Sequence, residues 1–252
     1  MLQALGWAAL GTGFTFLMTT LGAAVVFFFV EEPRPQFQRT MLGFAAGVMT
    51  AASVWSLLLP AIEQSADFGV PGWLPAAAGL LLGVGFLSAL DAVLPHLRRA
   101  RDMELSRRQS TLLMAAITLH NVPEGMAVGL AFALAAEGEG MAGAAALALG
   151  IGIQNLPEGA AISLPLRQEG SSRGRAFLLG TLSGSVEPIF GILVVLVAAG
   201  VRPLMPWLLS FAAGAMLYVV VEELVPQAHS KAGTCGFVGG FLIMMILDVA
   251  LG

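Results

Sequence analysis

Long apolar runs alternate with short polar stretches along the chain, and their lengths predict eight membrane-spanning helices. A helix needs about 20 mostly apolar residues to cross the hydrocarbon core of a bilayer. The runs that meet this requirement lie at about 4–30, 40–60, 72–95, 110–135, 142–166, 174–199, 204–226 and 234–251. Charged residues, proline and glycine fill the breaks, as in EEPRPQFQR after the first run. We therefore predict an all-α integral membrane protein with one transmembrane domain over residues 1–252.

The composition supports the same class of protein. Of the 252 residues, 57% are hydrophobic and 11% are charged, and the mean hydropathy is +0.85. Soluble domains contain roughly 25% charged residues. The net charge of -4 argues against a nucleic-acid partner, and the single cysteine, Cys235, excludes an intramolecular disulfide and a cysteine-based metal cluster. The expected surroundings are therefore the lipid bilayer.

Basic residues are distributed unequally between the two sets of loops. Eleven of the twelve Lys and Arg residues follow the odd-numbered predicted helices, and Arg202 alone lies on the other side. Loops rich in Lys and Arg stay in the cytoplasm. We therefore expect a multi-pass protein of the cell (inner) membrane with both termini extracytoplasmic. The opposite loops carry acidic residues that either keep them soluble or attract a cation, namely Glu63, Asp67, Glu137 and Glu139.

Three pairs of short segments repeat within the chain. ITLHNVPEGMAVGL aligns with IGIQNLPEGAAISL, FAAGVM with FAAGAM, and ALDAVLP with ILDVALG. Each pair joins an odd-numbered predicted helix to an even-numbered one, so its two members run in opposite directions. This pattern predicts an inverted-topology repeat, in which substrate sites lie near the middle of the membrane.

The hexapeptides HNVPEG and QNLPEG place polar side chains in the middle of two predicted spans. His120 and Glu124 are four residues apart and project from one face of their helix. Gln154 and Glu158 repeat this spacing on the next helix. Prolines inside the hexapeptides free backbone carbonyls, which is tolerated where neighbours or a water-filled cavity satisfy them. Further oxygen donors at a similar depth are Asn121, Asn155 and Glu187.

Three carboxylates without counter-charges would be very costly in hydrocarbon. No Lys or Arg lies in a predicted span at that depth. The carboxyl groups are therefore either protonated, tying helices together, or paired with a divalent cation. We favour the cation, because the convergent polar positions and two prolines exceed what packing requires. Imidazole with carboxylate and amide oxygens suits zinc or another first-row ion better than calcium.

Other residues nearer the helix ends have more than one interpretation. Glu63 and Asp248 could mark an entrance for a cation. An exit path could be formed by Asp91, His96, Glu222, Glu223 and His229. Interfacial solvation, or pairing with the arginine-rich loops, is the alternative. The glycine pairs at 43 and 47, 79 and 83, and 180 and 184 predict close helix packing.

The paired hexapeptides resemble the signature of the ZIP (Zrt-, Irt-like) divalent-metal transporters over essentially the whole chain. The glutamine in the second copy and the LSGSVEP stretch are similar to the bacterial GufA-like branch. The resemblance implies eight helices in a 3+2+3 arrangement and a binuclear metal site between the fourth and fifth. By motif it assigns to this site His120, Asn121, Glu124, Gln154, Asn155, Glu158 and Glu187, with Met49 on the second helix.

We therefore predict a transporter rather than an enzyme, moving zinc into the cytoplasm, with Cd²⁺, Fe²⁺ or Mn²⁺ as further cargoes. The alternative is an intramembrane zinc-dependent hydrolase, since zinc bound at HxxxE could activate water. An enzyme, however, does not need two near-copies of its motif in inverted helices. A membrane metal sensor would usually need a soluble output domain, which we do not expect here. The sequence leaves open whether the chain forms a homodimer.

Overall fold

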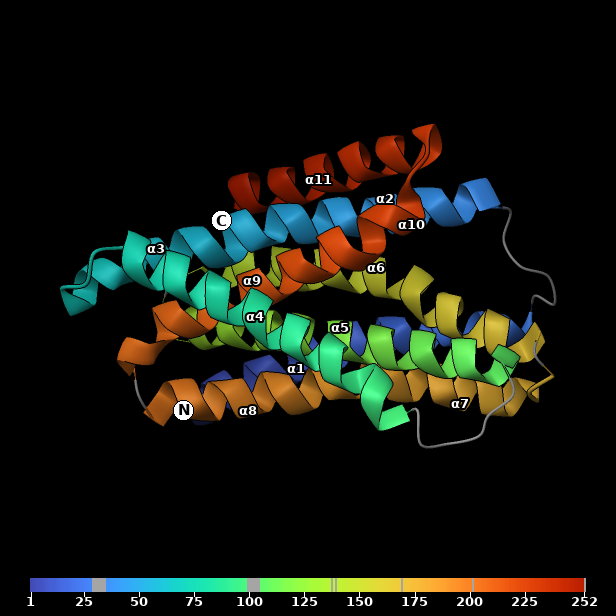
Figure 1. Cartoon of the computed structure of the whole chain (residues 1–252). Helices are drawn as coiled ribbons and strands as arrows, with labels where there is room; N and C mark the ends of the chain where they lie inside the picture. Colours follow the sequence, from blue (N-terminus) through green and yellow to red (C-terminus); the bar gives the residue numbers. More distant parts are fainter. Residues whose placement is uncertain are drawn as a thin grey trace.

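The computed structural model shows a bundle of long helices (Figure 1). It describes residues 1–28, 35–98, 105–136, 138, 140–168, 170–200 and 202–251. Within the helices, side chains at 91, 93–98, 105–117, 119–120, 168, 199–200, 202 and 251 are not described. All regular structure in the described residues is helical, which confirms the predicted all-α class.

The first half of the chain forms α1 (Leu2–Ala24), α2 (Pro35–Ala52), α3 (Leu59–Ser65), α4 (Trp73–Arg98) and α5 (Leu105–Ala135). The second half forms α6 (Met141–Gln168), α7 (Arg173–Gly184), α8 (Val186–Gly200), α9 (Met205–Val219), α10 (Val225–Ala228) and α11 (Lys231–Leu251). Short 3-10 segments are η1 (Val25–Phe27), η3 (Ala66–Phe68) and η4 (Arg202–Leu204). Two π-helical segments, η2 (Ser53–Leu58) and η5 (Val220–Leu224), join α2 to α3 and α9 to α10.

Each predicted span is helical over its described part, but some boundaries differ. The second span, expected at 40–60, is helical over Pro35–Phe68. The sixth is interrupted at Ser185, between α7 and α8. Six helical stretches of the described chain are long and apolar enough to cross a membrane. The helices that carry the hexapeptides, α5 and α6, are not among the six, and the eight-span 3+2+3 arrangement stays a prediction.

The two π-helical segments occupy matching places in the repeated sequences. η2 follows FAAGVM and η5 follows FAAGAM, each after the same short interval. A proline lies near the start of the α-helix that follows each one, Pro60 in α3 and Pro226 in α10. Proline lacks the backbone donor that would close an α-helical turn and clashes with the carbonyl four residues earlier. This accounts for a wider turn just before each proline.

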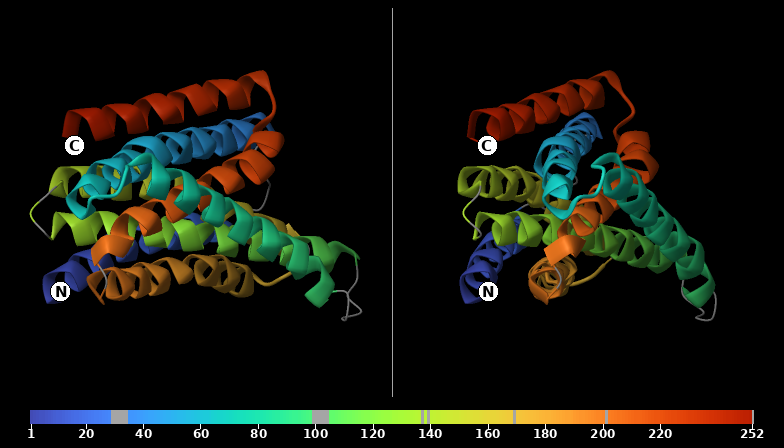
Figure 2. Two further views of the ribbon diagram at one scale, coloured as in Figure 1. Left: turned by 60° about the vertical axis from the view of Figure 1, so that its left-hand side comes forward. Right: turned by 90° about the vertical axis from the view of Figure 1, so that its left-hand side faces the viewer.

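Four helix pairs make the most extensive contacts in the bundle. α2 packs along α11, and α4 packs along α9. α1 packs along α6, and α5 packs along α8. Figure 2 shows α2 and α11 side by side at one edge, with α1 and α8 toward the opposite edge. The helices therefore form two groups, one of α2, α4, α9 and α11 and one of α1, α5, α6, α7 and α8.

Glycines set the closest approaches inside each group. An added side chain at Gly83 would collide with the backbone carbonyl of Phe211, and one at Gly240 with that of Phe44. When ALDAVLP is aligned with ILDVALG, Gly83 corresponds to Gly240. When FAAGVM is aligned with FAAGAM, Phe44 corresponds to Phe211, so the two contacts are equivalent. In the same alignments, the contact between Gly79 and Trp207 is equivalent to the contact between Gly236 and Thr40. Related positions in the two sequence repeats thus make the same contact.

The predicted packing role of the spaced glycines is confirmed. A side chain at position 43 or 47 would meet α11, one at 79 or 83 would meet α9, and one at 180 or 184 would meet α1. Without a hydrophobic drive between helices in lipid, such close backbone contact is a main source of association. These contacts join α2 to α11, α4 to α9 and α7 to α1.

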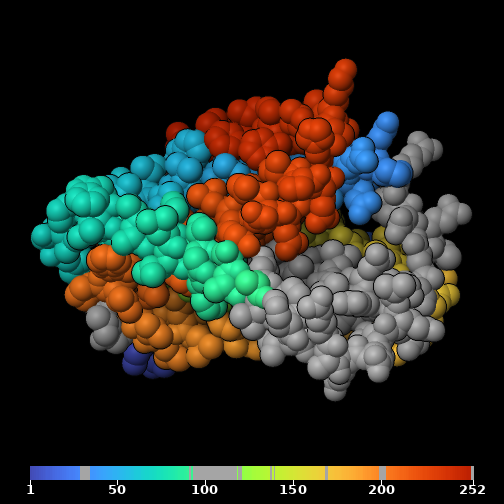
Figure 3. Space-filling view, viewed as in Figure 1, coloured from blue at the N-terminus to red at the C-terminus, as the bar shows by residue number. Residues whose placement is uncertain are grey.

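The two ends of the bundle carry different features. Both chain termini lie at the end that also holds α3, and the turn from α10 to α11 lies at the other end (Figure 1). Figure 3 shows α4, α10 and α11 covering one face between these ends. The acidic residue Glu63, on α3, and His229, at the α10–α11 turn, are therefore at opposite ends.

Gly240→Ala should destabilise the protein while Gly239→Ala should not. Alanine at 240 would collide with the backbone of Phe44, whereas nothing lies within 4 Å of an added side chain at 239. Overpacking costs about 1–3 kcal/mol, and glycine to alanine in an open helix position gains about 0.5–1 kcal/mol. Thermal unfolding in detergent compares the two variants. Equal melting temperatures would show that the α2–α11 contact does not limit stability.

Candidate metal site

Both hexapeptides lie inside continuous helices near the middle of the bundle. The first is part of α5, with Pro123 in its interior, and the second is part of α6, with Pro157 in its interior. Both helices continue through their prolines, and this agrees with the prediction from the sequence. The polar side chains are therefore presented by rigid helical backbone, which favours a well-defined binding geometry.

A hydrogen bond links the two hexapeptides directly. The side-chain amide of Gln154 donates to Oε1 of Glu124 over 2.6 Å. Both side chains have no exposed surface. Glu124 also interacts electrostatically with Glu158 and Glu187, so the structure brings the three carboxylates together. α5, α6 and α8 thus each supply one carboxylate to the same buried region.

Glu187 lies in the first turn of α8, directly after the break at Ser185. Its Oε1 accepts a hydrogen bond from the Thr19 hydroxyl over 3.1 Å, and its Oε2 accepts one from Asn155 Nδ2 over 3.0 Å. The free backbone N–H groups of a helix N-terminus also favour a negative charge there. The break between α7 and α8 therefore places this fully buried carboxylate where its charge is stabilised.

The asparagine of each hexapeptide ties its helix to a neighbour. Asn121 Nδ2 donates to the backbone carbonyl of Ser183 over 3.0 Å, and Asn155 Nδ2 donates to that of Thr15 over 3.3 Å. We expected both asparagines only as oxygen ligands. Their nitrogens have a structural role, and their oxygens remain free to bind a cation.

The closing glycine of each hexapeptide has a role that sequence reasoning missed. An added side chain at Gly125 would collide with the backbone of Glu187, and one at Gly159 with that of Thr19. Each glycine lies four residues after the asparagine and so shares its face of the helix. This face docks the hexapeptide helix on its neighbour, and the adjacent face carries the glutamate.

Several buried oxygens of this region have no hydrogen-bond partner among the described residues. They are Asn121 Oδ1, Glu124 Oε2, Gln154 Oε1 and Asn155 Oδ1. A buried polar atom without a partner costs about 1–3 kcal/mol, so a concentration of such atoms indicates a ligand. All four of these atoms are oxygens that can accept a hydrogen bond or bind a cation. Beside carboxylates, such oxygens indicate a cation as the ligand. Carboxylate and amide oxygens suit a divalent ion.

Two further residues predicted for the site, His120 and Met49, lie on α5 and α2. His120 lies on α5, but its side chain is outside the described residues. Met49 is fully buried on α2, which packs against α6. No group of three or more His, Cys, Asp or Glu residues is arranged to hold a metal among the side chains that are described. The metal roles of His120 and Met49 stay predictions.

A polar cavity of about 600 Å³ opens near the end that carries α3. Both predicted entrance residues, Glu63 and Asp248, line it, together with Asp67 and Gln64. Ser56 donates a hydrogen bond to Asp248 over 2.6 Å. The cavity does not reach Glu124, which has no exposed surface. This end of the bundle therefore offers an acidic vestibule that stops short of the buried carboxylates.

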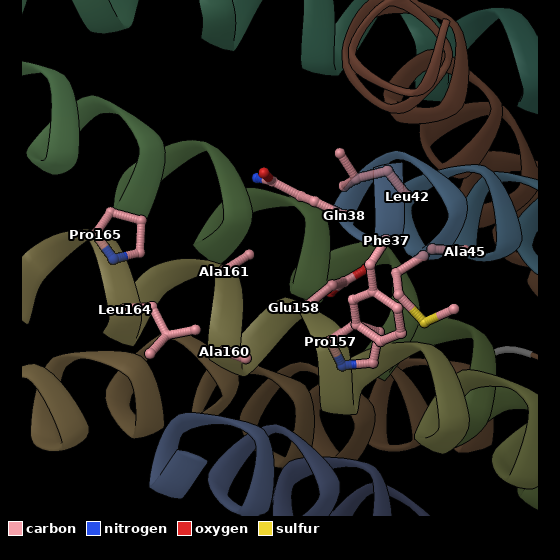
Figure 4. A pocket seen from close by; sticks show the side chains of 11 residues that line it. Phe37, Gln38, Leu42, Ala45, Pro157, Glu158, Ala160, Ala161, Leu164 and Pro165 are labelled. Atoms are coloured by element: carbon pink, nitrogen blue, oxygen red, sulfur yellow. The ribbon is translucent and has the colours of Figure 1, made fainter. Parts of the chain in front are cut away.

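A second, mainly apolar cavity of about 80 Å³ lies on the other side of the carboxylates, between α2 and α6. Figure 4 shows Glu158 reaching from α6 toward α2, with Phe37 and Pro157 beside it. Leu42 and Leu164 are also part of its lining. Apolar side chains therefore surround Glu158 in the direction opposite to the acidic vestibule.

The three predicted exit residues whose side chains are described do not line either of these cavities. Glu222 and Glu223 lie in η5, exposed and half-buried respectively, and His229 is exposed at the α10–α11 turn. The side chains of Asp91 and His96 are outside the described residues. The exit path stays a prediction.

Sequence reasoning also missed the contribution of the first helix. Thr12, Thr15 and Thr19 are fully buried along one side of α1. Their spacing of three and four residues in an otherwise apolar run is the signal that could have identified this polar stripe. α1 therefore supplies both a hydroxyl donor and a backbone acceptor to the site.

Comparison with known proteins identifies relatives along the whole chain. The family model described as "ZIP Zinc transporter" matches residues 98–248. Human zinc transporter ZIP11 is 37% identical over 97% of this chain and 97% of its own length. Zinc transporter GufA of Myxococcus xanthus is 38% identical over 93% and 94%. Zinc transporter ZIPB of Bordetella bronchiseptica is 38% identical over 98% of this chain and 82% of its own.

Water should reach the vestibule but not the helix wall behind it. In a Cys235→Ser background, we expect Glu63→Cys to react quickly with a hydrophilic thiol reagent, because Glu63 is exposed in the vestibule. Leu57→Cys, on the same helical stretch but fully buried, is the matched control and should not react. Mass spectrometry of the detergent-solubilised protein measures both. Equal labelling of the two positions would contradict the described cavity.

Proposed function

Because the chain belongs to the ZIP family of zinc transporters, we propose that it carries zinc across the membrane through a site formed by its two hexapeptides. Members of this family are transporters, not enzymes, so the alternative of an intramembrane hydrolase is not supported. The observation that carries the proposal is the cluster of three buried carboxylates with unpartnered amide oxygens around the Gln154–Glu124 hydrogen bond.

We propose that this site is binuclear, with a half-site at each hexapeptide. Glu124 would lie between them, since one of its oxygens contacts Gln154 and the other is unpartnered. His120 and Asn121 would complete the half-site on α5. The half-site on α6 would include Gln154, Asn155 and Glu158, with Glu187 from α8 and Met49 from α2. The same nitrogen and oxygen donors would accept Cd²⁺, Fe²⁺ or Mn²⁺ as secondary cargoes.

The proposed architecture is a 3+2+3 inverted repeat of eight spans. α5 and α6 would form the central pair between two three-span halves. Support comes from the matching π-helical segments, the matching glycine contacts and the matching bonds of Asn121 and Asn155. In inverted repeats the substrate site lies at the interface between the repeats, and α5 and α6, which carry Glu124 and Glu158, would form that interface.

We propose that zinc enters through the vestibule at Glu63 and Asp248 and leaves at the opposite, cytoplasmic end. The distribution of basic residues supports this direction, because it puts the vestibule outside. Its carboxylates would raise the local cation concentration. The buried cluster is closed to the vestibule in this structure, and Glu158 faces α2 of the other helix group across the small apolar cavity. Relative movement of these groups would open the site alternately to each side.

Glu124→Ala and Glu158→Ala should each lower zinc uptake into proteoliposomes to about a tenth or less. Removal of one anionic ligand would remove more than about 1.4 kcal/mol of binding free energy, which corresponds to tenfold. Glu124→Gln keeps the size and a hydrogen-bond acceptor for Gln154 and should fail as well, because it lacks the charge. Size-exclusion chromatography controls for folding. Near-normal uptake by both alanine variants would refute the assignment.

The orientation can be measured with two engineered cysteines in the Cys235→Ser background. An impermeant thiol reagent should label Glu63→Cys in intact cells whose outer membrane, if present, is permeabilised. His229→Cys, exposed at the other end, should react only after the inner membrane is opened. The reverse pattern would invert the proposed direction without affecting the metal site.

A further inference from the structure

We propose that Thr19 on α1 is a positioning residue for the metal site, acting through the carboxylate of Glu187. The inference rests on the proposed role of Glu187 as a ligand and extends it to a helix that carries neither hexapeptide. The direct observation is the hydrogen bond of 3.1 Å from the Thr19 hydroxyl to Glu187 Oε1.

The three buried threonines of α1 use their hydroxyls differently. Thr12 donates to the carbonyl of Ala8 over 2.7 Å, and Thr15 donates to that of Thr12 over 3.0 Å. Both are the local bonds that hydroxyls usually make in helices. The Thr15 hydroxyl also interacts with the Glu187 carboxylate, but its own hydrogen bond is to the carbonyl of Thr12. Thr19 can also bond within α1, to the Thr15 carbonyl over 3.3 Å, but its contact with Glu187 is shorter.

A count of hydrogens shows which bond the Thr19 hydroxyl makes. The Asn155 amide has two hydrogens, which serve Thr15 O and Glu187 Oε2. Thr19 has a single hydrogen for two acceptors, Thr15 O and Glu187 Oε1. Thr15 O already accepts from Asn155, and an ionised carboxylate is the stronger acceptor. The shorter distance and the stronger acceptor both favour the bond from Thr19 to Glu187.

Glu187 is consequently held by both oxygens, from two different helices. α1 holds Oε1 through Thr19, and α6 holds Oε2 through Asn155. Groups that orient ligating carboxylates in this way typically change metal affinity about 10- to 100-fold when removed. Without the Thr19 hydroxyl, Oε1 would be buried with one donor fewer, and the carboxylate could turn about its bond to Asn155.

The position of Thr19 in the fold explains why it meets Glu187. The Gly159 contact with the Thr19 carbonyl matches the Gly125 contact with the Glu187 carbonyl. Thr19 in α1 and Glu187 in α8 therefore occupy equivalent positions, each opposite the closing glycine of a hexapeptide. One half of the chain supplies a carboxylate at this place, and the other half supplies the donor that orients it.

Thr19→Val tests the proposal, because valine keeps the shape that packs against Gly184 and removes only the hydroxyl. We expect the zinc KM for uptake into proteoliposomes to rise about threefold to tenfold, with the maximal rate much less affected. Calorimetric titration with zinc should show the same loss of affinity. Thr19→Ser restores the hydroxyl and should bring both values to within about twofold of the native protein.

Thr12→Val is the matched control, since Thr12 is equally buried on α1 but its hydroxyl donates to the Ala8 carbonyl of its own helix. It should leave KM and zinc affinity unchanged. A native KM and affinity for Thr19→Val, or equal losses for Thr19→Ser or Thr12→Val, would overturn the proposal. If Thr19→Val does not fold, Thr19→Ala replaces it with the same expected result.

Glu187→Gln separates this inference from the proposed function. A raised KM for Glu187→Gln with a native KM for Thr19→Val would reject Thr19 alone. A native KM for Glu187→Gln would instead remove Glu187 from the proposed site, and with it the reason for the role of Thr19.

Discussion

The burial of three acidic side chains in the middle of the helices is the constraint on which this bundle depends. Glu124 and Glu187 have no exposed surface, and Glu158 is nearly as buried. Dipoles are the partners that the described residues supply: a threonine hydroxyl, two carboxamides and a helix N-terminus. Such groups reduce the penalty of burial but leave net negative charge and unpaired oxygens. A cation can complete the arrangement and can also leave it, which a basic side chain cannot do.

Each hexapeptide forms about one and a half helical turns and has two adjacent faces with different roles. Its second and sixth residues, Asn and Gly, fasten the helix to a neighbour, while its fifth residue, Glu, points to the site. Gly125 and Gly159 allow the backbone contact, and Asn121 and Asn155 add a hydrogen bond one turn away. Because docking and binding use adjacent faces, the geometry of the ligands is fixed by the same contacts that assemble the bundle.

The sequence predicted the helices, their approximate limits and the polar cluster, because apolar length and buried charge are visible in a single chain. It also placed Glu63 and Asp248 together at one end, where the structure finds a shared cavity. The π-helical segments were not predictable, since a wider turn leaves no mark in the apolar pattern. The role of Thr19 was also hidden, because a threonine in a membrane helix usually bonds to its own backbone, and only tertiary contacts show which hydroxyl does otherwise.

The paired π-helical segments have a consequence for the direction of the side chains that follow them. An α-helix turns by about 100° per residue, so the extra residue in η2 or η5 rotates everything beyond it relative to an unbroken helix. Beyond η2 this rotation sets the direction in which Glu63 points, and deletion of one residue would turn α3 away from the vestibule. Such an insertion is tolerated only where the rotated side chains remain useful. It occurs at the same interval after FAAGVM and after FAAGAM, so α3 and α10 are rotated in the same way.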